Sequence, residues 1–461
     1  MRPTAVVLID GEHYPAVVVD ALRQAEDVFD IRAALFLGGG EKIRSAEFET
    51  EAAGIYGLPV VFDDDCARGL ARLIDEYRPE VVVDLSDEPV LGYRQRFRLI
   101  SEALARDVGY EGPDFHFSPT SSTRLCASPS LSIIGTGKRI GKTAVSGYVA
   151  RALREVVTGR AGGPEVVVVA MGRGGPARPE VIDGAGGALT IKDLLAWSRQ
   201  GRHAASDHFE DALLSRLTTV GCRRCGGGMA GEPFSSNVAE GVVLANSLGP
   251  GLIVLEGSGA ALPPVGTDAC LLVAGAHQSV ETIVGYLGTY RLLVSDGLVL
   301  TMAEEPSASQ EKVRSVLEAV QRVKPGMPAV PVVFRPRPLG DVRGRQVAFF
   351  TTAPASQEGL LRQCLEERWG CRVECFSSNL ADRAALKVDL AREEMARVEM
   401  FLTEIKAAAI DVVAEEGESR GLPVIAVDNE PEEIPSERPG RLAELVGELG
   451  EMAEERFERR R

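Results

Sequence analysis

The chain has 461 residues and a mass of 49.3 kDa, which corresponds to about two to four domains of typical size and excludes a single small module. Hydrophobic residues make up 45% of the sequence and charged residues 26%, the composition of a folded globular protein. Because the net charge of −16 repels polyanions over long range, we expect neither nucleic acid nor a membrane as a partner.

The N-terminal sequence MRPTAVVLIDGEHYP reaches acidic residues within ten positions and shows no separate apolar region or cleavage site, so it predicts a first strand instead of a signal peptide. No apolar run approaches the roughly 18 to 20 residues that span a bilayer. The eight cysteines follow no disulfide framework. We therefore expect a cytoplasmic protein with reduced thiols.

Short apolar runs alternate with helix-compatible stretches, the pattern of a mainly parallel α/β sheet. The first four predicted strands, at residues 5–9, 33–37, 59–62 and 81–85, indicate an N-terminal doubly wound α/β domain over residues 1–126. Asp10 and Asp84 end two of these strands, where such sheets bind ligands, although Asp10 equally suits a helix cap. Residues 118–130, SPTSSTRLCASPS, have the composition of a domain junction.

A second series of predicted strands defines a nucleotide-binding core over residues 127–335, with strands at 131–134, 165–170, 252–255, 269–273, 297–300 and 331–334. Its insert, residues 172–250, exceeds a simple crossover, and such insertions are usually functional. A C-terminal α/β region over residues 336–461 follows, either separate or extending the central sheet. We predict its strands at 347–351, 372–376 and 423–427 and its helices at 356–368, 390–416 and 436–458.

A glycine-rich loop connects the strand at 131–134 to an amphipathic helix and ends in Gly141, Lys142 and Thr143. In such loops the backbone N–H groups converge on phosphate oxygens, the lysine reaches the β- and γ-phosphates, and the threonine hydroxyl binds Mg²⁺. The spacing is G-x5-GKT instead of the common G-x4-GK[ST]. The sequence therefore predicts a P-loop NTPase core with ATP and Mg²⁺ as cofactors and with these nucleotide-binding residues: Gly135, Thr136, Gly137, Ile140, Gly141, Lys142, Thr143 and Ala144.

This loop, GTGKRIGKT, resembles that of dethiobiotin synthetase, GTDTEVGKT, whose later strand ending VEGAGG corresponds to LIVLEGSGA at residues 252–260. A carboxylate at a strand end near the phosphate loop is placed to hold Mg²⁺. We therefore assign Glu256 as a metal ligand or water-positioning group, with a solvated glutamate as the alternative. Gly137 and Arg139 replace the acidic residues of that loop and Lys138 adds a cation, which indicates a more anionic substrate.

Two further segments carry paired arginines. Arginines bind phosphates well through two parallel hydrogen bonds, and the alternative is a turn whose arginines point to solvent. Arg173 and Arg178 lie in MGRGGPARP, and Arg223 and Arg224 lie in GCRRCGGG. The second segment holds a Cys222-x-x-Cys225 pair, but nothing completes the four ligands of a zinc site. An anion-binding loop and a structural turn are equally compatible with it.

Five stretches together, LIDGEHYP, GTGKRIGKT, VVAMGRGGP, TVGCRRCGGG and LEGSG, resemble the cyclic 2,3-diphosphoglycerate synthetase family. The resemblance implies ATP-dependent formation of an intramolecular phosphoanhydride in 2,3-diphosphoglycerate, with ADP and phosphate as products. It implies metal binding by Thr143 and Glu256. The implied catalytic residues are Lys138, Arg139, Lys142 and Glu256, and the implied substrate-binding residues are Lys138, Arg139, Arg173, Arg178, Arg223 and Arg224.

P-loop proteins of this group often dimerise, so the resemblance also leaves room for a homodimer formed through the first domain. Two other functions stay open at this stage. One is an ATP-dependent ligase acting on another polyanionic acid. The other is a P-loop nucleotide switch or metallochaperone, which would use Cys222 and Cys225 for metal transfer.

Overall fold

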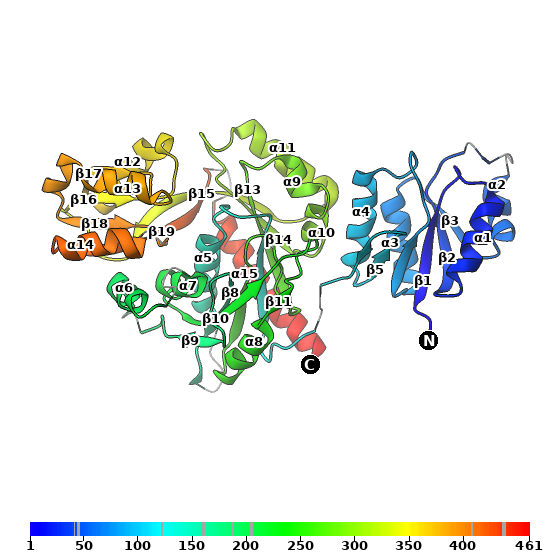
Figure 1. Ribbon diagram of the computed structural model, residues 1–461, viewed down its shortest axis with the longest axis horizontal. Helices are drawn as coiled ribbons and strands as arrows, with labels where there is room; N and C mark the ends of the chain where they lie inside the picture. The colour runs from blue at the N-terminus through cyan, green and yellow to red at the C-terminus, as the bar shows by residue number, and fades with distance from the viewer. Residues whose placement is uncertain are drawn as a thin grey trace.

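The computed structural model describes the whole chain except positions 41, 44–46, 121–122, 158–161, 187–188, 203–205, 407–408 and 436–438. It contains two sheets, one of six strands near the N-terminus and one of thirteen strands that extends through the rest of the chain. The smaller sheet and its helices form a lobe at one end of the elongated molecule (Figure 1). In the described part of the chain, no helix combines the length and apolar character needed to cross a membrane.

The six-stranded sheet has the order β3-β2-β1-β4-β5-β6. Its strands and helices are β1 (Thr4–Ile9), α1 (Pro15–Ala25), β2 (Asp30–Phe36), α2 (Phe48–Tyr56), β3 (Val60–Phe62), α3 (Cys66–Tyr77), β4 (Val81–Asp84), α4 (Tyr93–Leu104), β5 (Gly109–Glu111) and β6 (His116–Phe117). β1 is apolar along its length because helices cover both faces of a parallel sheet. The four strands predicted here are confirmed as β1 to β4, and the doubly wound α/β fold is confirmed.

The larger sheet has the order β11-β10-β8-β12-β7-β13-β14-β15-β19-β18-β16-β17, with β9 paired to β10. Its strands are β7 (Ser130–Gly135), β8 (Val166–Gly172), β9 (Glu180–Ile182), β10 (Thr218–Cys225), β11 (Ser235–Ser236), β12 (Leu252–Glu256), β13 (Ala269–Gly275), β14 (Gly297–Thr301), β15 (Ala329–Pro338), β16 (Gln346–Phe350), β17 (Arg372–Ser377), β18 (Met400–Thr403) and β19 (Val424–Glu433). β15 and β19 pair antiparallel and join the central strands to the C-terminal ones. The expected division at residues 335–336 falls inside β15.

Helices lie along both faces of this sheet (Figure 1). They are α5 (Lys142–Arg154), α6 (Ile191–Arg199), α7 (Asp207–Ser215), α8 (Val238–Ser247), α9 (Val280–Val284), α10 (Gly288–Leu293), α11 (Gln310–Val323), α12 (Glu358–Trp369), α13 (Arg383–Leu390), α14 (Glu415–Ser419) and α15 (Arg441–Arg460). The predicted start of the last helix, residues 436–438, lies outside the described residues.

Two expectations for the later chain are wrong. The single helix predicted over residues 390–416 is interrupted by β18, because the buried run Met400–Thr403 pairs with β16 and β19 inside the sheet. Residues 221–225 form part of β10 instead of a turn or loop, since residues 221–223 pair with β8 and residues 224–225 pair with β11. In both places pairing with distant strands, which leaves no local signal, decides the conformation.

The last helix, α15, returns to the central sheet and packs beside α5, β7 and β13 (Figure 1). Leu442, Leu445, Val446 and Leu449 are buried in the same apolar cluster as the strands on either side of the phosphate loop. The C-terminal residues therefore belong to the packing of the nucleotide core, although the sequence separates them from it by about a hundred residues.

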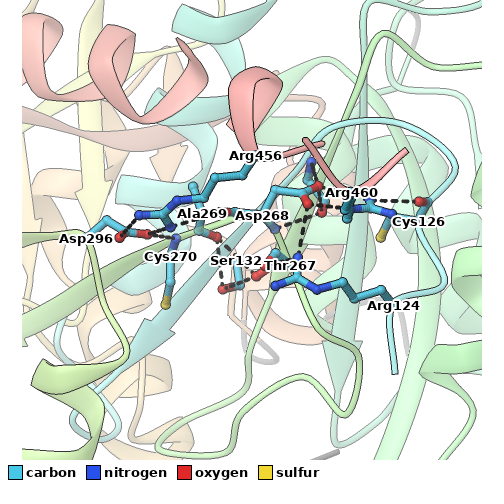
Figure 2. Close-up of polar contacts among 11 residues, drawn as sticks. Arg124, Cys126, Ser132, Thr267, Asp268, Ala269, Cys270, Asp296, Arg456 and Arg460 are labelled. Carbon is cyan, nitrogen blue, oxygen red and sulfur yellow. Dashed lines mark hydrogen bonds and ion pairs between the residues drawn. The ribbon is translucent and has the colours of Figure 1, made fainter. Parts of the chain in front are cut away.

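Asp268, just before β13, connects this helix to the core through a buried polar network (Figure 2). Its carboxylate accepts hydrogen bonds from the Ser130 backbone and hydroxyl at 3.0 and 2.7 Å. It also pairs with Arg460 of α15 at 2.6 Å and with Arg124 of the interdomain segment at 3.1 Å. The side chain of Asp268 is fully buried, so these partners compensate for its desolvation.

We expect Asp268→Ala to destabilise the central core by about 3 kcal/mol, because it removes the acceptor shared by a buried backbone N–H and two arginines. Thermal unfolding of the variant should show a lower midpoint. Asp20→Ala, which breaks the exposed pair between Asp20 and Arg23, should leave the midpoint unchanged. Equal midpoints for the two variants would contradict the role assigned to Asp268.

Candidate functional site

The phosphate loop lies where four parallel strands end side by side. β7 leads into the loop and pairs with β12 on one side and β13 on the other, and β8 lies beyond β12. Because the carboxyl ends of parallel strands meet at one edge of a sheet, Glu256 at the end of β12 lies beside the loop. The sheet register therefore explains why residues about 115 positions apart in the sequence, such as Lys142 and Glu256, are in contact.

Glycines at both ends of the loop are required by close packing. Gly141 has a φ of +73°, and a Cβ there would lie 2.1 Å from the ring of Phe334 on β15. A Cβ on Gly135 would lie 2.8 Å from Ile140 and 3.1 Å from the carbonyl oxygen of Gly259. The loop is thus held in one conformation, and α5 begins at Lys142 without a side-chain cap. Its first N–H groups are available to an anion.

Lys142 is folded onto Glu256. Its ammonium lies 2.6 Å from Glu256 Oε1 and also donates to the Gly257 carbonyl, while the Thr143 hydroxyl donates to Glu256 Oε1 at 3.2 Å. Both charged side chains are more than nine-tenths buried. Burial alone would raise the pKa of Glu256, but the charge of Lys142, with hydrogen bonds from Lys142 and Thr143, holds it below its usual value. Without a bound phosphate, the carboxylate supplies the negative charge that Lys142 needs.

A row of carboxylates on α7 adjoins this pair. Asp207, Glu210 and Asp211 lie three and four residues apart and therefore share one face of the helix. Asp211 Oδ2 and Glu256 Oε2 are both buried without a hydrogen-bond partner among the described residues. Burial, and next the charge of Glu256, raises the pKa of Asp211 well above its usual value and also raises that of Asp207.

Asp207, Glu210 and Asp211 were not identified as site residues from the sequence, although their spacing of three and four residues indicates a shared helix face.

Lys406, in the turn after β18, pairs with Glu210 at 2.9 Å. Four carboxylates therefore share three cations, Lys142, Lys406 and Arg173, the last acting on Asp207. This imbalance leaves room for added positive charge, which is the electrostatic requirement of a cation site.

The donor set fits Mg²⁺. The Thr143 hydroxyl, Glu256 Oε2 and Asp211 Oδ2 are hard oxygen donors, and the last two lack partners. The described residues contain no group of three or more carboxylate, histidine or cysteine ligands arranged around one metal position. Mg²⁺ accepts such a site because it keeps several waters and binds through few protein carboxylates together with substrate phosphates.

Three cationic side chains converge at Gly259, in the turn after β12. A Cβ on Gly259 would lie 2.8 Å from Nη2 of Arg173, 3.8 Å from Nη2 of Arg224 and 3.7 Å from Cγ of Lys138. Within the described chain, none of these three cations forms an ion pair with a carboxylate, although the charge of Asp207 acts on Arg173 and Arg224. Arg224 is 8% exposed, and burial, followed by the charge of Arg173, lowers its pKa. Two guanidinium groups held this close together favour a multiply charged anion.

The other predicted arginines are not among the three nearest contacts at Gly259. Arg139 and Arg178 are exposed, as Lys138 and Arg173 are, and Arg139 has a φ of +59° within the loop. Arg223 lies on the face of β10 opposite Arg224, because strand residues alternate. Arg223 shares its face of β10 with Gly221, which packs on His208 of α7. Arg224 shares the opposite face with Cys222, which packs on Gly241 of α8. The structure thus brings Lys138, Arg173 and Arg224 together and separates Arg223 from them.

The two cysteines of the C-x-x-C pair also lie on opposite faces of β10. Cys222 is buried and Cys225 is exposed, and burial raises the pKa of Cys222 to about 12. A shared metal needs both sulfurs as thiolates on one side of the strand. This arrangement argues against the metal-transfer site that a metallochaperone would need here.

Comparison with known protein families gives three matches that together cover most of the chain. They are "Cyclic 2,3-diphosphoglycerate synthetase, N-terminal domain" at residues 4–118, the "P-loop domain" of the same enzyme at residues 130–333 and its "C-terminal domain" at residues 338–430. The P-loop match confirms the nucleotide-binding fold predicted from the loop sequence.

Curated relatives named cyclic 2,3-diphosphoglycerate synthetase align with nearly the whole chain. The cyclic 2,3-diphosphoglycerate synthetase of Rubrobacter xylanophilus is 52% identical over 427 residues, covering 92% of this chain and 93% of that protein. The Methanothermobacter thermautotrophicus protein is 44% identical and covers 96% of this chain and 94% of its own length. The Methanothermus fervidus protein is 41% identical and covers 99% and 98%.

The α7 carboxylates predict a pH-dependent stability. Because folding raises the pKa of Asp207, Glu210 and Asp211, their stabilising contribution is complete below the unfolded value of about 4 and is lost as pH rises through the folded-state pKa values. In ligand-free protein, Asp211→Asn should therefore reduce the fall in melting temperature between about pH 5 and pH 8.5. The exposed control Asp20→Asn should keep the wild-type slope, and an unchanged slope in Asp211→Asn would contradict the assignment.

Proposed function

The chain belongs to the cyclic 2,3-diphosphoglycerate synthetase family, and on this premise we propose how its residues catalyse the reaction. It is an ATP-dependent synthetase that closes 2,3-diphosphoglycerate into its cyclic phosphoanhydride and releases ADP and phosphate. The observation that supports the site assignment is the adjacency of two features, the buried Lys142–Glu256 pair of the phosphate loop and the unpaired cations around Gly259.

The nucleotide phosphates would lie on the phosphate loop, residues 135–141, and on the first N–H groups of α5, including Ala144. Lys142 exchanges its contact with Glu256 for oxygens of the β- and γ-phosphates. This exchange is favourable because the ammonium never loses an anionic partner, so binding does not leave a buried charge unpaired.

Mg²⁺ would be held by Thr143 and Glu256, with Asp211 as an additional carboxylate beside them. When bound, it neutralises charge on the phosphate oxygens during phosphoryl transfer. Release of Glu256 from Lys142 frees a second carboxylate oxygen for this purpose.

The substrate would bind at Gly259 between Lys138, Arg173 and Arg224. 2,3-Diphosphoglycerate has two phosphates and a carboxylate, and ring closure brings the two phosphates into contact. Repulsion between them must be offset by fixed positive charge. We retain Arg139, Arg178 and Arg223 as candidate substrate-binding residues, since they have no acidic partner among the described side chains.

The proposed chemistry has two displacements at phosphorus. One substrate phosphate attacks the γ-phosphorus of ATP, so that a P–O–P bond forms and ADP leaves. An oxygen of the other substrate phosphate then attacks the inner phosphorus of that anhydride and expels inorganic phosphate. Lys142, Lys138 and Arg139 would stabilise the developing charge, and Glu256 would position the metal and water.

The family relationship also leads us to propose a cytoplasmic enzyme that acts on a small molecule as a homodimer. Light scattering on the purified protein tests the assembly: a mass of twice 49.3 kDa is expected, and a single-chain mass would exclude the dimer.

The reaction itself is tested by incubating the protein with ATP, Mg²⁺ and 2,3-diphosphoglycerate and recording phosphorus NMR. A cyclic pyrophosphate resonance should appear together with ADP and phosphate. Lys142→Ala should abolish ADP formation, because the γ-phosphoryl loses its charge partner, while circular dichroism stays that of the wild type. ADP release without a cyclic product would favour a ligase for another polyanion, and unchanged turnover in Lys142→Ala would refute the assignment of the loop.

The substrate cluster gives a second test in the same assay. Arg173→Ala should raise KM for 2,3-diphosphoglycerate about tenfold or more, the effect of losing a charge-assisted contact of about 1.5 to 3 kcal/mol. KM for ATP should change much less. Arg178→Ala removes an arginine of the same segment that is not among the three nearest contacts at Gly259 and should have a smaller effect; equal KM values for the two variants would contradict the cluster.

A further inference from the structure

A buried arginine that the proposed reaction does not use lies next to the substrate cluster. Arg291, on α10, is 6% exposed and has no acidic partner in the described part of the chain. Its guanidinium binds only backbone carbonyl oxygens. Placing a guanidinium in the interior without a carboxylate is costly unless its N–H groups are satisfied and its charge is used.

Two of the three carbonyls that Arg291 binds belong to the loops at residues 226–231 and residues 257–262. Its Nε and Nη2 donate to Ala260 O at 3.2 and 2.7 Å, and Nη2 also donates to Met229 O at 3.3 Å. The remaining contact, from Nη1 to Leu287 O at 2.9 Å, fixes the side chain to the start of its own helix. One guanidinium therefore crosslinks both loops to α10.

Arg224 connects the same two loops a few residues away. Its Nη1 donates to Gly226 O at 2.5 Å and its Nη2 to Ser258 O at 2.8 Å. A backbone hydrogen bond from Leu262 N to Gly231 O at 2.8 Å also connects the two loops. The substrate cluster at Gly259 thus lies between two arginine crosslinks, and only Arg224 reaches the cluster itself.

The orientation of the carbonyl groups explains how the hydrogen bonds of Arg224 and Arg291 favour binding of an anion. Ser258 O and Ala260 O flank Gly259 and would repel a phosphate if they pointed toward it. Both are directed onto guanidinium groups. Because no carboxylate forms an ion pair with Arg291, its positive field also extends to the cationic side chains around Gly259.

We propose that Arg291 is a positioning residue for the substrate anion: it fixes the loops at residues 226–231 and 257–262 so that Arg224 and Gly259 present a preformed anion site. The inference rests on the proposed function, because it takes the cluster at Gly259 as the place where 2,3-diphosphoglycerate binds. Arg291 does not touch the substrate and acts through the loops.

The test is direct binding of 2,3-diphosphoglycerate, without ATP, by titration calorimetry, beside binding of ADP with Mg²⁺. Arg291→Met should weaken 2,3-diphosphoglycerate binding about tenfold to a hundredfold, the range expected when buried acceptors lose a charged donor. ADP binding should stay within about twofold. Arg291→Lys, which keeps the charge but cannot bind both loops in a fork, should recover part of the affinity.

Arg456 supplies the matched control. It also joins a backbone carbonyl, that of Asp268, but at the opposite edge of the sheet, where it pairs with Asp296 (Figure 2). Arg456→Met should lower the melting temperature and leave both affinities unchanged. A purely structural role for Arg291 would give the same result, or would weaken ADP and 2,3-diphosphoglycerate alike, and either outcome would overturn the proposal.

If Arg291→Met does not fold, Arg291→Lys decides alone: a selective loss for 2,3-diphosphoglycerate supports the proposal, and unchanged binding refutes it. Absence of 2,3-diphosphoglycerate binding by the wild type would also refute it. Formation of the cyclic product by the wild type is a separate measurement, so failure of the proposed function is distinguishable from failure of the role of Arg291.

Discussion

The buried contact between Lys142 and Glu256 is the interaction on which the rest of the site depends. Two opposite charges removed from water must stay paired, and the parallel register of β7 and β12 keeps them paired by ending both strands at the same edge. A phosphate can replace the carboxylate as the partner of Lys142. In the function proposed above, the carboxylate that it displaces would then be available, beside Thr143, for a metal ion.

Around this pair the site separates its charges into two zones. Acidic groups lie on the α7 side, where we propose a metal ion, and cations without an ion pair lie on the Gly259 side, where we propose the substrate polyanion. The chain as a whole carries a net charge of −16, so this positive zone is a local exception. It persists because Arg224 and Arg291 donate hydrogen bonds to carbonyl oxygens instead of forming ion pairs with carboxylates.

Segments far apart in the sequence meet to build this arrangement. The insert between β8 and β12 supplies α7 and Arg224, β15 supplies the ring of Phe334 against Gly141, and the turn after β18 supplies Lys406 against Glu210. The C-terminal helix packs on the strands beside the loop. The helix expected over residues 390–416 was wrong for the same reason that Lys406 is near the site: β18 is held by its neighbours in the sheet, not by its own residues.

The sequence by itself determined the alternation of strands and helices and the phosphate loop, because these depend on local composition and on spacing within a few residues. Glu256 as the acidic neighbour of the loop came from its position at a strand end and from the resemblance to a known family, since it lies about 115 positions from Lys142. The tertiary structure alone decided which arginines converge. Side chains alternate along β10, so Arg223 and Arg224 point to opposite faces although they are neighbours in the sequence. It also decided the role of Asp211 and Arg291, whose neighbours come from other strands and loops. Burial and charge pairing are properties of the packed chain, so they become visible only after distant segments have met.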